Sequence, residues 1–139
     1  MAKGHFVGDV VARWLKDGRK MKLREDFQFV DSKGIKWKVP KGSVVDGASI
    51  PKILWASVGP PFVGKYRRAT VLHDVACVER SKPHKKTHRM LYEAMLADNT
   101  PKLIAKKIYY AVAMFGPKWD KNGKDLTFDD DKAFKLLEE

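Results

Sequence analysis

The chain has 139 residues, 44% of them hydrophobic and 11% aromatic, which is typical of a folded globular protein and excludes a disordered one. Its 28 lysines and arginines outnumber 17 aspartates and glutamates, and the net charge of +11 attracts nucleic acid, acidic lipid or an acidic protein. The length predicts a single domain over residues 1–139, and neither a membrane-spanning apolar run nor a secretion leader is expected.

Residues 5–45 carry short β-prone segments separated by turn sequences, which predicts a β-rich front made of hairpins. Between two of the turns, Ile35, Trp37 and Val39 alternate with lysines. This period of two is typical of a strand with one buried face and one face in water. The turns are expected at Asp17-Gly18, at Asp31 to Gly34 and at Pro40 to Gly42.

Helical spacing of apolar residues takes over in residues 50–116. A short helix is expected to begin at Ser49, and three longer helices should span about residues 66–80, 84–98 and 101–115. The acidic tail, residues 118–139, holds Thr127 and Asp130 at the spacing of a capping box, which predicts one last short helix. The expected fold is α+β, with N-terminal β-hairpins packed on a three-helix C-terminal bundle.

The apolar stripes of these elements also predict the core. On the third long helix, Ile104, Ile108 and Val112 recur at helical spacing, and the stripe ends at Phe115 before Gly116-Pro117. The expected core residues are Trp37, Trp55, Leu72, Leu91, Ile108, Val112 and Phe115.

The adjacent pair His73-Asp74 lies at the head of the helical part and is the first candidate for chemistry. Neighbouring helix positions point about a third of a turn apart, so the two side chains could line one pocket and serve different partners. An imidazole there could activate water, and the carboxylate could hold a hard cation. A lone helical histidine is more often packed or solvated, so the structural interpretation stays open as well.

The second candidate is Asp46, which stands directly before Gly47 in a tight strand-to-helix turn. One interpretation is a turn followed by a helix cap at Ser49. The other is that Asp46 joins Asp74 around a Ca²⁺ ion, because hard cations prefer several oxygen ligands from carboxylates and irregular backbone. The residues leave both interpretations of Asp46 open.

The segments around the first two long helices are rich in lysine and arginine. His84 and His88, four residues apart, could chelate a transition metal, but no third ligand is evident from the sequence. A solvated basic face that binds an acidic partner is the favoured interpretation. Its expected members are Arg67, Arg68, Lys82, Lys85, Lys86 and Arg89.

Cys77, the chain's single cysteine, can form no internal disulfide and has no second cysteine for a cysteine-based metal site. It therefore suits a reducing compartment. The cytoplasm is the expected location on this ground.

An ordered series of motifs between about Val39 and Gly116 resembles a family of phage and prophage proteins, number thirteen-fifty-three among the domains of unknown function. The resemblance is carried by Val39-Pro40 with Gly42, Asp46 to Pro51, Trp55, Tyr66 to Ala69, His73-Asp74, Glu93 to Met95, Tyr110 to Val112 and Phe115-Gly116.

That family is in turn distantly similar to secreted phospholipases of the A-two type, which set a His-Asp pair on one helix against a second helix and a calcium loop. The resemblance implies that His73 activates water and that Asp74 binds calcium. The chain departs from the family at Cys77, where a tyrosine is usual, and at His88, where an aspartate on the next helix is usual. His88 is the third candidate catalytic residue by its place in the motif, and without the aspartate His73 is expected to lack its usual orienting partner.

Two functions follow from these observations. The first is a phage or prophage virion component of the tail, neck or capsid, which binds other virion proteins or an acidic host component, with nucleic acid also a candidate partner. The alternative is a Ca²⁺-dependent ester or phospholipid hydrolase that uses His73, Asp74 and Asp46. The departures at Cys77 and His88 and the basic surface favour the binding role.

Overall fold

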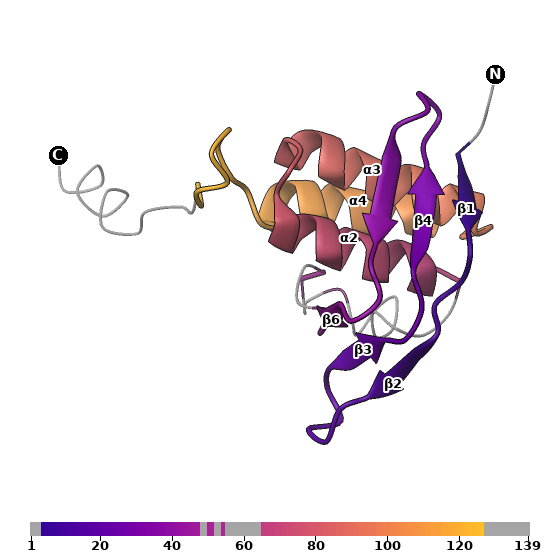
Figure 1. Ribbon diagram of the computed structural model, residues 1–139. Helices are drawn as coiled ribbons and strands as arrows, with labels where there is room; N and C mark the ends of the chain where they lie inside the picture. Colours follow the sequence, from indigo (N-terminus) through magenta and orange to yellow (C-terminus); the bar gives the residue numbers. More distant parts are fainter. Residues whose placement is uncertain (1–3, 48–49, 52–53, 55–64, 127–139) are drawn as a thin grey trace, which may run out of the picture.

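The computed structural model describes residues 4–47, 50, 51, 54 and 65–126 and shows an α+β fold, which confirms the predicted class (Figure 1). One antiparallel sheet has the order β1 (His5–Val7), β4 (Phe27–Val30), β5 (Lys36–Val39). The other has the order β2 (Ala12–Trp14), β3 (Met21–Leu23), β6 (Val44–Val45). The helices are α2 (Arg67–Glu79), α3 (His84–Ala97) and α4 (Lys102–Phe115). The predictions at Ser49, Trp55 and Thr127 to Asp130 lie outside the described residues.

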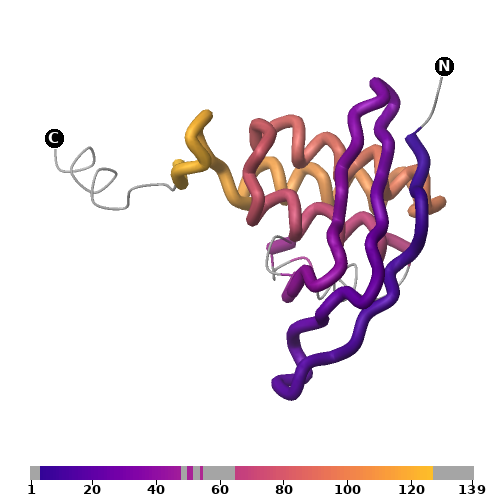
Figure 2. Tube along the Cα trace, in the orientation of Figure 1, coloured from indigo at the N-terminus to yellow at the C-terminus, as the bar shows by residue number. Residues whose placement is uncertain are grey.

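Two of the three predicted turns close hairpins. Asp17-Gly18 joins β2 to β3, and the turn at Asp31 to Gly34 joins β4 to β5. The prediction of a third hairpin at Pro40 to Gly42 was wrong. This turn carries the chain from β5 into the other sheet, where β6 pairs with β3, and Figure 2 shows this crossing of the chain. The amide of Gly42 donates to the carbonyl of Leu23 at 2.8 Å, so the turn itself is held against β3.

The hairpin between β4 and β5 explains the alternating pattern in the sequence. Trp37 and Val39 are buried as predicted, and the two lysines that alternate with them are exposed. Asp31 stabilises the turn, because its carboxylate accepts hydrogen bonds from the amides of Lys33 and Ile35, both at 2.9 Å. Its second oxygen accepts the indole N–H of Trp37 at 3.0 Å, which satisfies the polar atom of a buried ring.

Helix α2 is enclosed by other elements. It contacts α3 and the strands β5 and β6, while α3 also contacts α4 and β1. Figure 1 shows the sheet of β1, β4 and β5 crossing one side of the helices. Every residue from Ala69 to Val75 is buried, which is typical of a helix surrounded by protein. No helix in the described part of the chain has both the length and the apolar character needed to cross a membrane.

The predicted core is confirmed at Trp37, Leu72, Leu91, Ile108 and Val112, which are all buried. The prediction for Phe115 was wrong, since this side chain is 69% exposed in the last turn of α4. Beyond the helix the chain turns back, and Trp119, only 3% exposed, places its ring against His84 and His88 instead. The aromatic side chain that covers this end of the helices therefore comes from the segment after α4.

The substitution Ile108→Ala should lower the free energy of unfolding by about 2 to 5 kcal/mol, because Ile108 is 1% exposed and the truncation leaves a cavity. Leu103→Ala on the same helix is the matched control, because Leu103 is 82% exposed and its loss should cost less than about 0.5 kcal/mol. Urea unfolding of both variants measures the difference. Equal losses would place Ile108 outside the core.

Candidate functional site

Helix α2 directs His73 and Asp74 toward different neighbours, as their positions on the helix predict. His73 and Cys77 lie one helical turn apart on α2. The imidazole of His73 and the sulfur of Cys77 both lie close to His88 of α3. Asp74 lies beside the turn that follows β6. The close packing of α2 against α3 and β6 therefore creates two adjoining polar sites.

The first of these is a chain of hydrogen bonds through two histidines. His73 Nε2 lies 2.8 Å from His88 Nδ1, and His88 Nε2 lies 2.7 Å from the carbonyl oxygen of Pro117. A carbonyl oxygen can only accept, so His88 carries its proton on Nε2 and leaves a lone pair on Nδ1. His73 Nε2–H then donates to that lone pair. The backbone of Pro117 thus fixes the tautomer of both imidazoles.

Burial controls the charge of this pair. Desolvation lowers the pKa of His73 well below its usual value, and the neighbouring His88 lowers it further. Desolvation also lowers the pKa of His88, although the carbonyl of Pro117 acts in the opposite direction. Both rings are therefore neutral at physiological pH, in agreement with the tautomers that the hydrogen bonds require.

Cys77 completes a compact buried cluster with the two histidines. Its Sγ lies 3.5 Å from Nε2 and 3.8 Å from Nδ1 of His73. Burial raises the pKa of the Cys77 thiol to about 12, with a further contribution from the carboxylate of Asp74. The thiol is therefore protonated in the absence of a cation, and it is no ready nucleophile.

Asp74 has a clear structural contact. Its Oδ2 accepts the amide N–H of Asp46 at 3.0 Å and that of Gly47 at 3.2 Å. Gly47 has a φ of 76°, a left-handed conformation that favours glycine. The carboxylate thus holds the turn after β6 against α2. The structure therefore brings Asp46 and Asp74 together, as predicted, but the contact uses the backbone amide of Asp46. In the described residues, no cluster of three acidic ligands lies there.

A cavity of about 390 Å³ adjoins Asp74. Acidic, basic and apolar residues line it together with the single cysteine. His73 does not line it, because its side chain has no exposed surface. The lining residues are Lys20, Val44, Val45, Asp46, Asp74, Cys77, Val78, Arg80 and Pro117.

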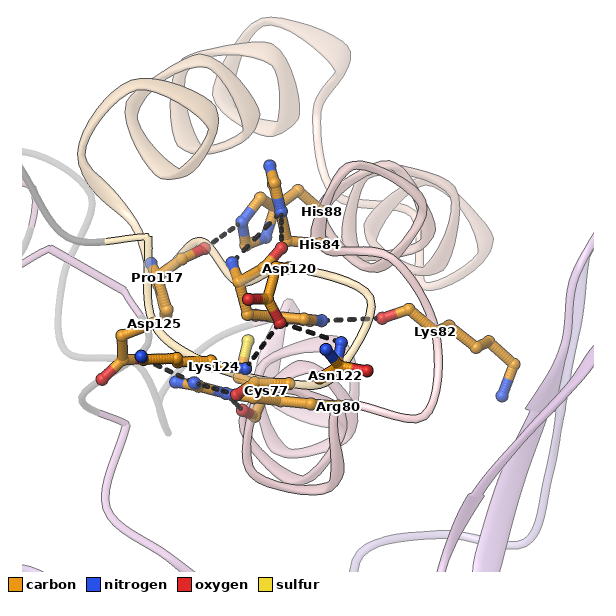
Figure 3. A network of polar contacts seen from close by, with 12 residues as sticks. Cys77, Arg80, Lys82, His84, His88, Pro117, Asp120, Asn122, Lys124 and Asp125 are labelled. Atoms are coloured by element: carbon orange, nitrogen blue, oxygen red, sulfur yellow. Dashed lines mark hydrogen bonds and ion pairs between the residues drawn. The ribbon is translucent and has the colours of Figure 1, made fainter.

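The segment after α4 closes the histidine site, and its Trp119 was not among the predicted core or site residues. The indole N–H of Trp119 donates to the carbonyl of Lys82 at 2.9 Å, and His84 Nδ1 lies 2.9 Å from the carbonyl of Trp119. Arg80 donates to the carbonyl of Gly123 at 2.9 Å and pairs with Asp125 (Figure 3). The acidic charge of Asp125, in a chain with a basic helical part, was the signal in the sequence for its pairing with Arg80.

His84 and His88, the predicted chelating pair, have different partners. Their ring centroids are 6.0 Å apart, and His84 is occupied with the backbone of Trp119. His88 turns instead toward His73 and Pro117. The pair that meets is therefore His73 with His88, from two helices.

The structure divides the predicted basic face into two groups. Lys85, Lys86 and Arg89 are exposed on the first half of α3, beside Lys82, whose Nζ lies 4.4 Å from the centre of the Trp37 ring. Arg67 and Arg68 lie at the start of α2, and Arg68 pairs with Asp98 just beyond the opposite end of α3. The two helices run in opposite directions, so these groups lie at opposite ends.

The comparison with protein families identifies the chain's relatives. The family described as protein of unknown function (DUF1353) matches residues 21–112, which is more than half of the chain. The chain belongs to the DUF1353 family. This DUF1353 segment includes His73, Asp74, Cys77 and His88, so the buried cluster lies inside the family domain.

Two bacterial proteins of Sinorhizobium fredii (strain NBRC 101917 / NGR234) are similar to this DUF1353 chain. It is 47% identical over 97 residues to the uncharacterized protein y4jT. This aligned region makes up 70% of this chain and 29% of y4jT. It is 44% identical over 97 residues to the uncharacterized protein y4iH, and this aligned region makes up 70% of this chain and 41% of y4iH. The match thus spans less than half the length of each relative. No solved structure matches the chain.

Proposed function

We propose that the chain is a non-enzymatic component of a phage or prophage particle that binds an acidic virion protein through the first half of α3. The observation that carries binding over catalysis is the enclosure of His73, whose side chain has no exposed surface and whose Nε2 donates to His88. A general base has to come within hydrogen-bonding distance of the proton that it removes. An imidazole enclosed between two helices instead supports a structural role for the pair.

The binding surface is the α3 basic segment, which we define as Lys85, Lys86 and Arg89. These side chains line a cavity of about 430 Å³, whose wall includes Trp37 and Ile35. Cations around an aromatic and aliphatic floor suit a partner with acidic side chains and a small apolar anchor. Glu93, also at this cavity, would select lysine or arginine at the partner's edge.

The assignment to a particle is supported by the resemblance of the motif series to phage and prophage proteins. Membership in the DUF1353 family agrees with the same motifs, since the matched residues 21–112 contain most of them. The tail, neck and capsid are the sites to examine. Copurification of the chain with assembled particles is the direct test, and its absence from purified particles would contradict this part of the proposal.

The double substitution Lys85→Glu, Lys86→Glu should abolish most of the binding to proteins released from the particle, because it reverses two exposed charges of the α3 basic segment. Binding by the unaltered chain should also weaken as salt rises to about 1 M, where the Debye length falls to about 3 Å. Affinity chromatography on the immobilised chain measures both effects.

Lys106→Glu, Lys107→Glu is the matched control, because these lysines are also adjacent and exposed but lie on α4. It changes the net charge equally and should leave binding intact. Equal loss in both double variants would show that net charge alone acts. Loss of binding after nuclease treatment would identify nucleic acid as the partner and contradict the proposal of an acidic protein.

The second candidate function is ester hydrolysis of the phospholipase A-two kind. The observation that favours it is the contact between His73 and His88, which supplies the orienting acceptor that the usual aspartate would provide. In this mechanism His73 would be the general base, Asp46 and Asp74 would hold Ca²⁺, and the ester would enter the cavity of about 390 Å³. The mechanism requires His73 to gain access to that cavity, and the variants of His73 described in the Discussion test it.

A further inference from the structure

Three buried side chains place potential metal ligands against one another between α2 and α3. His73, Cys77 and His88 each direct one nitrogen or sulfur atom so that the ligand atoms lie within 4.8 Å of one another. All three residues are buried. In the described part of the chain, this is the one group of three such residues that meets this condition.

The hydrogen bond from His88 to Pro117 prepares this cluster for a cation. Histidines that bind metals almost always donate their other ring N–H to a carbonyl or carboxylate, which fixes the ligand nitrogen and its orientation. His88 Nε2 donates to the carbonyl of Pro117 at 2.7 Å, so its Nδ1 lone pair faces His73. The supporting contact of a metal-binding histidine is thus already present.

Two of the three spacings between ligand atoms can be compared with a tetrahedral site, and the third, between Cys77 Sγ and the His88 ring, lies within 4.8 Å. Zinc lies about 2.0 to 2.1 Å from histidine nitrogen and about 2.3 Å from thiolate sulfur, so tetrahedral ligands are separated by about 3.3 Å for two nitrogens and about 3.6 Å for nitrogen and sulfur. Cys77 Sγ and His73 Nε2 are 3.5 Å apart, close to the required spacing. The two histidine nitrogens, at 2.8 Å, would have to separate by about 0.5 Å.

We propose that His73, Cys77 and His88 bind a zinc-class transition-metal ion, with water as the fourth ligand. Nitrogen and thiolate ligands select such ions over Ca²⁺ and Mg²⁺, which prefer oxygen. Water reaches the site from the cavity of about 390 Å³, whose wall includes Cys77 and Pro117. On binding, the Cys77 thiol releases its proton to solvent, and the ring proton of His73 moves from Nε2 to Nδ1, which frees Nε2 as a ligand. The ion would join α2 to α3, and its binding is independent of any partner that the α3 basic segment binds.

The test is titration of the chelator-treated full chain with Zn²⁺ and with Co²⁺. Calorimetry should give one zinc ion per chain, and zinc should raise the unfolding temperature. The cobalt-loaded chain should show the visible bands of a tetrahedral ion and a thiolate-to-cobalt charge-transfer band in the near ultraviolet. This spectrum of the unaltered protein requires no variant. Failure of either metal to bind, or a cobalt spectrum without the thiolate band, would overturn the proposal.

Variants then identify the ligands. Cys77→Ser should remove the thiolate band and weaken zinc binding by more than the roughly 10- to 100-fold that loss of a supporting hydrogen bond costs. His84→Gln is the matched control, because His84 is also on α3 but binds the backbone of Trp119. It should retain the affinity of the parent. If His84→Gln loses zinc and Cys77→Ser retains it, the metal binds to the helix surface and the buried site is excluded.

Discussion

Replacement of His73 by alanine should lower the free energy of unfolding by roughly 3 kcal/mol or more, since it combines a cavity with a stranded polar group. The imidazole has no exposed surface, so its removal leaves a void between α2 and α3. It also removes the N–H that donates to His88 Nδ1 at 2.8 Å. Urea unfolding of the chelator-treated chain measures the loss without a contribution from any bound ion.

His5→Ala is the matched control for loss of an imidazole, because His5 is exposed on β1. It should change the free energy of unfolding by less than about 0.5 kcal/mol. A His73→Ala variant as stable as this control would show that the imidazole does not bridge the helices.

The same variant separates binding from hydrolysis. The binding proposal expects no cation-dependent turnover of phospholipid or short-chain esters by the parent chain. A hydrolase instead requires turnover with Ca²⁺ that disappears in His73→Ala and in Asp74→Asn. Turnover by the parent that is lost in folded variants would contradict the binding proposal.

The sequence predicted those parts of the fold that depend on local patterns. The alternation around Trp37 gave a strand, and helical spacing located α2, α3 and α4 within one or two residues of their observed ends. Turn sequences cannot specify which strands pair over a distance. The turn at Pro40 to Gly42 therefore suggested a hairpin, whereas β6 pairs with β3 and β1 with β4.

The error at Phe115 has a similar origin. An apolar stripe shows which face of a helix is buried, but not where the neighbouring elements end. Phe115 continues the stripe of α4 into its last turn and is exposed, while Trp119 approaches from the segment that follows. Trp119 belonged to no periodic pattern, so no local rule could place it in the site.

The candidate site was predictable in its residues and much less so in its contacts. Resemblance placed His88 opposite His73, and the structure puts their nitrogens within 2.8 Å. The acceptor for His88 is a backbone carbonyl, that of Pro117, which leaves no signature in a sequence. Cys77 was judged by its lack of a second cysteine, whereas the two histidines that it meets come from its own helix and from α3.

Lowering the pH of the metal-free chain from about 7 to about 5 should reduce its free energy of unfolding, because the unfolded histidines have a pKa of about 6.5. Burial lowers the pKa of His73 well below that value and also lowers the pKa of His88. Above the unfolded pKa both states are neutral, and the full stability is present. Below it, the unfolded chain binds protons that the folded chain does not bind, so stability falls until the folded histidines also titrate.

Each such proton contributes a slope approaching about 1.4 kcal/mol per pH unit. The variant His73→Gln removes one titrating group from both states, so it should show a shallower loss of stability over the same range. Urea unfolding at a series of pH values in the presence of chelator gives both slopes. His5→Gln is the matched control for loss of a histidine, because His5 is exposed on β1, and it should leave the slope of the parent unchanged. A flat profile for the parent, or equal slopes for parent and His73→Gln, would mean that His73 takes up a proton as readily in the folded chain as in the unfolded one.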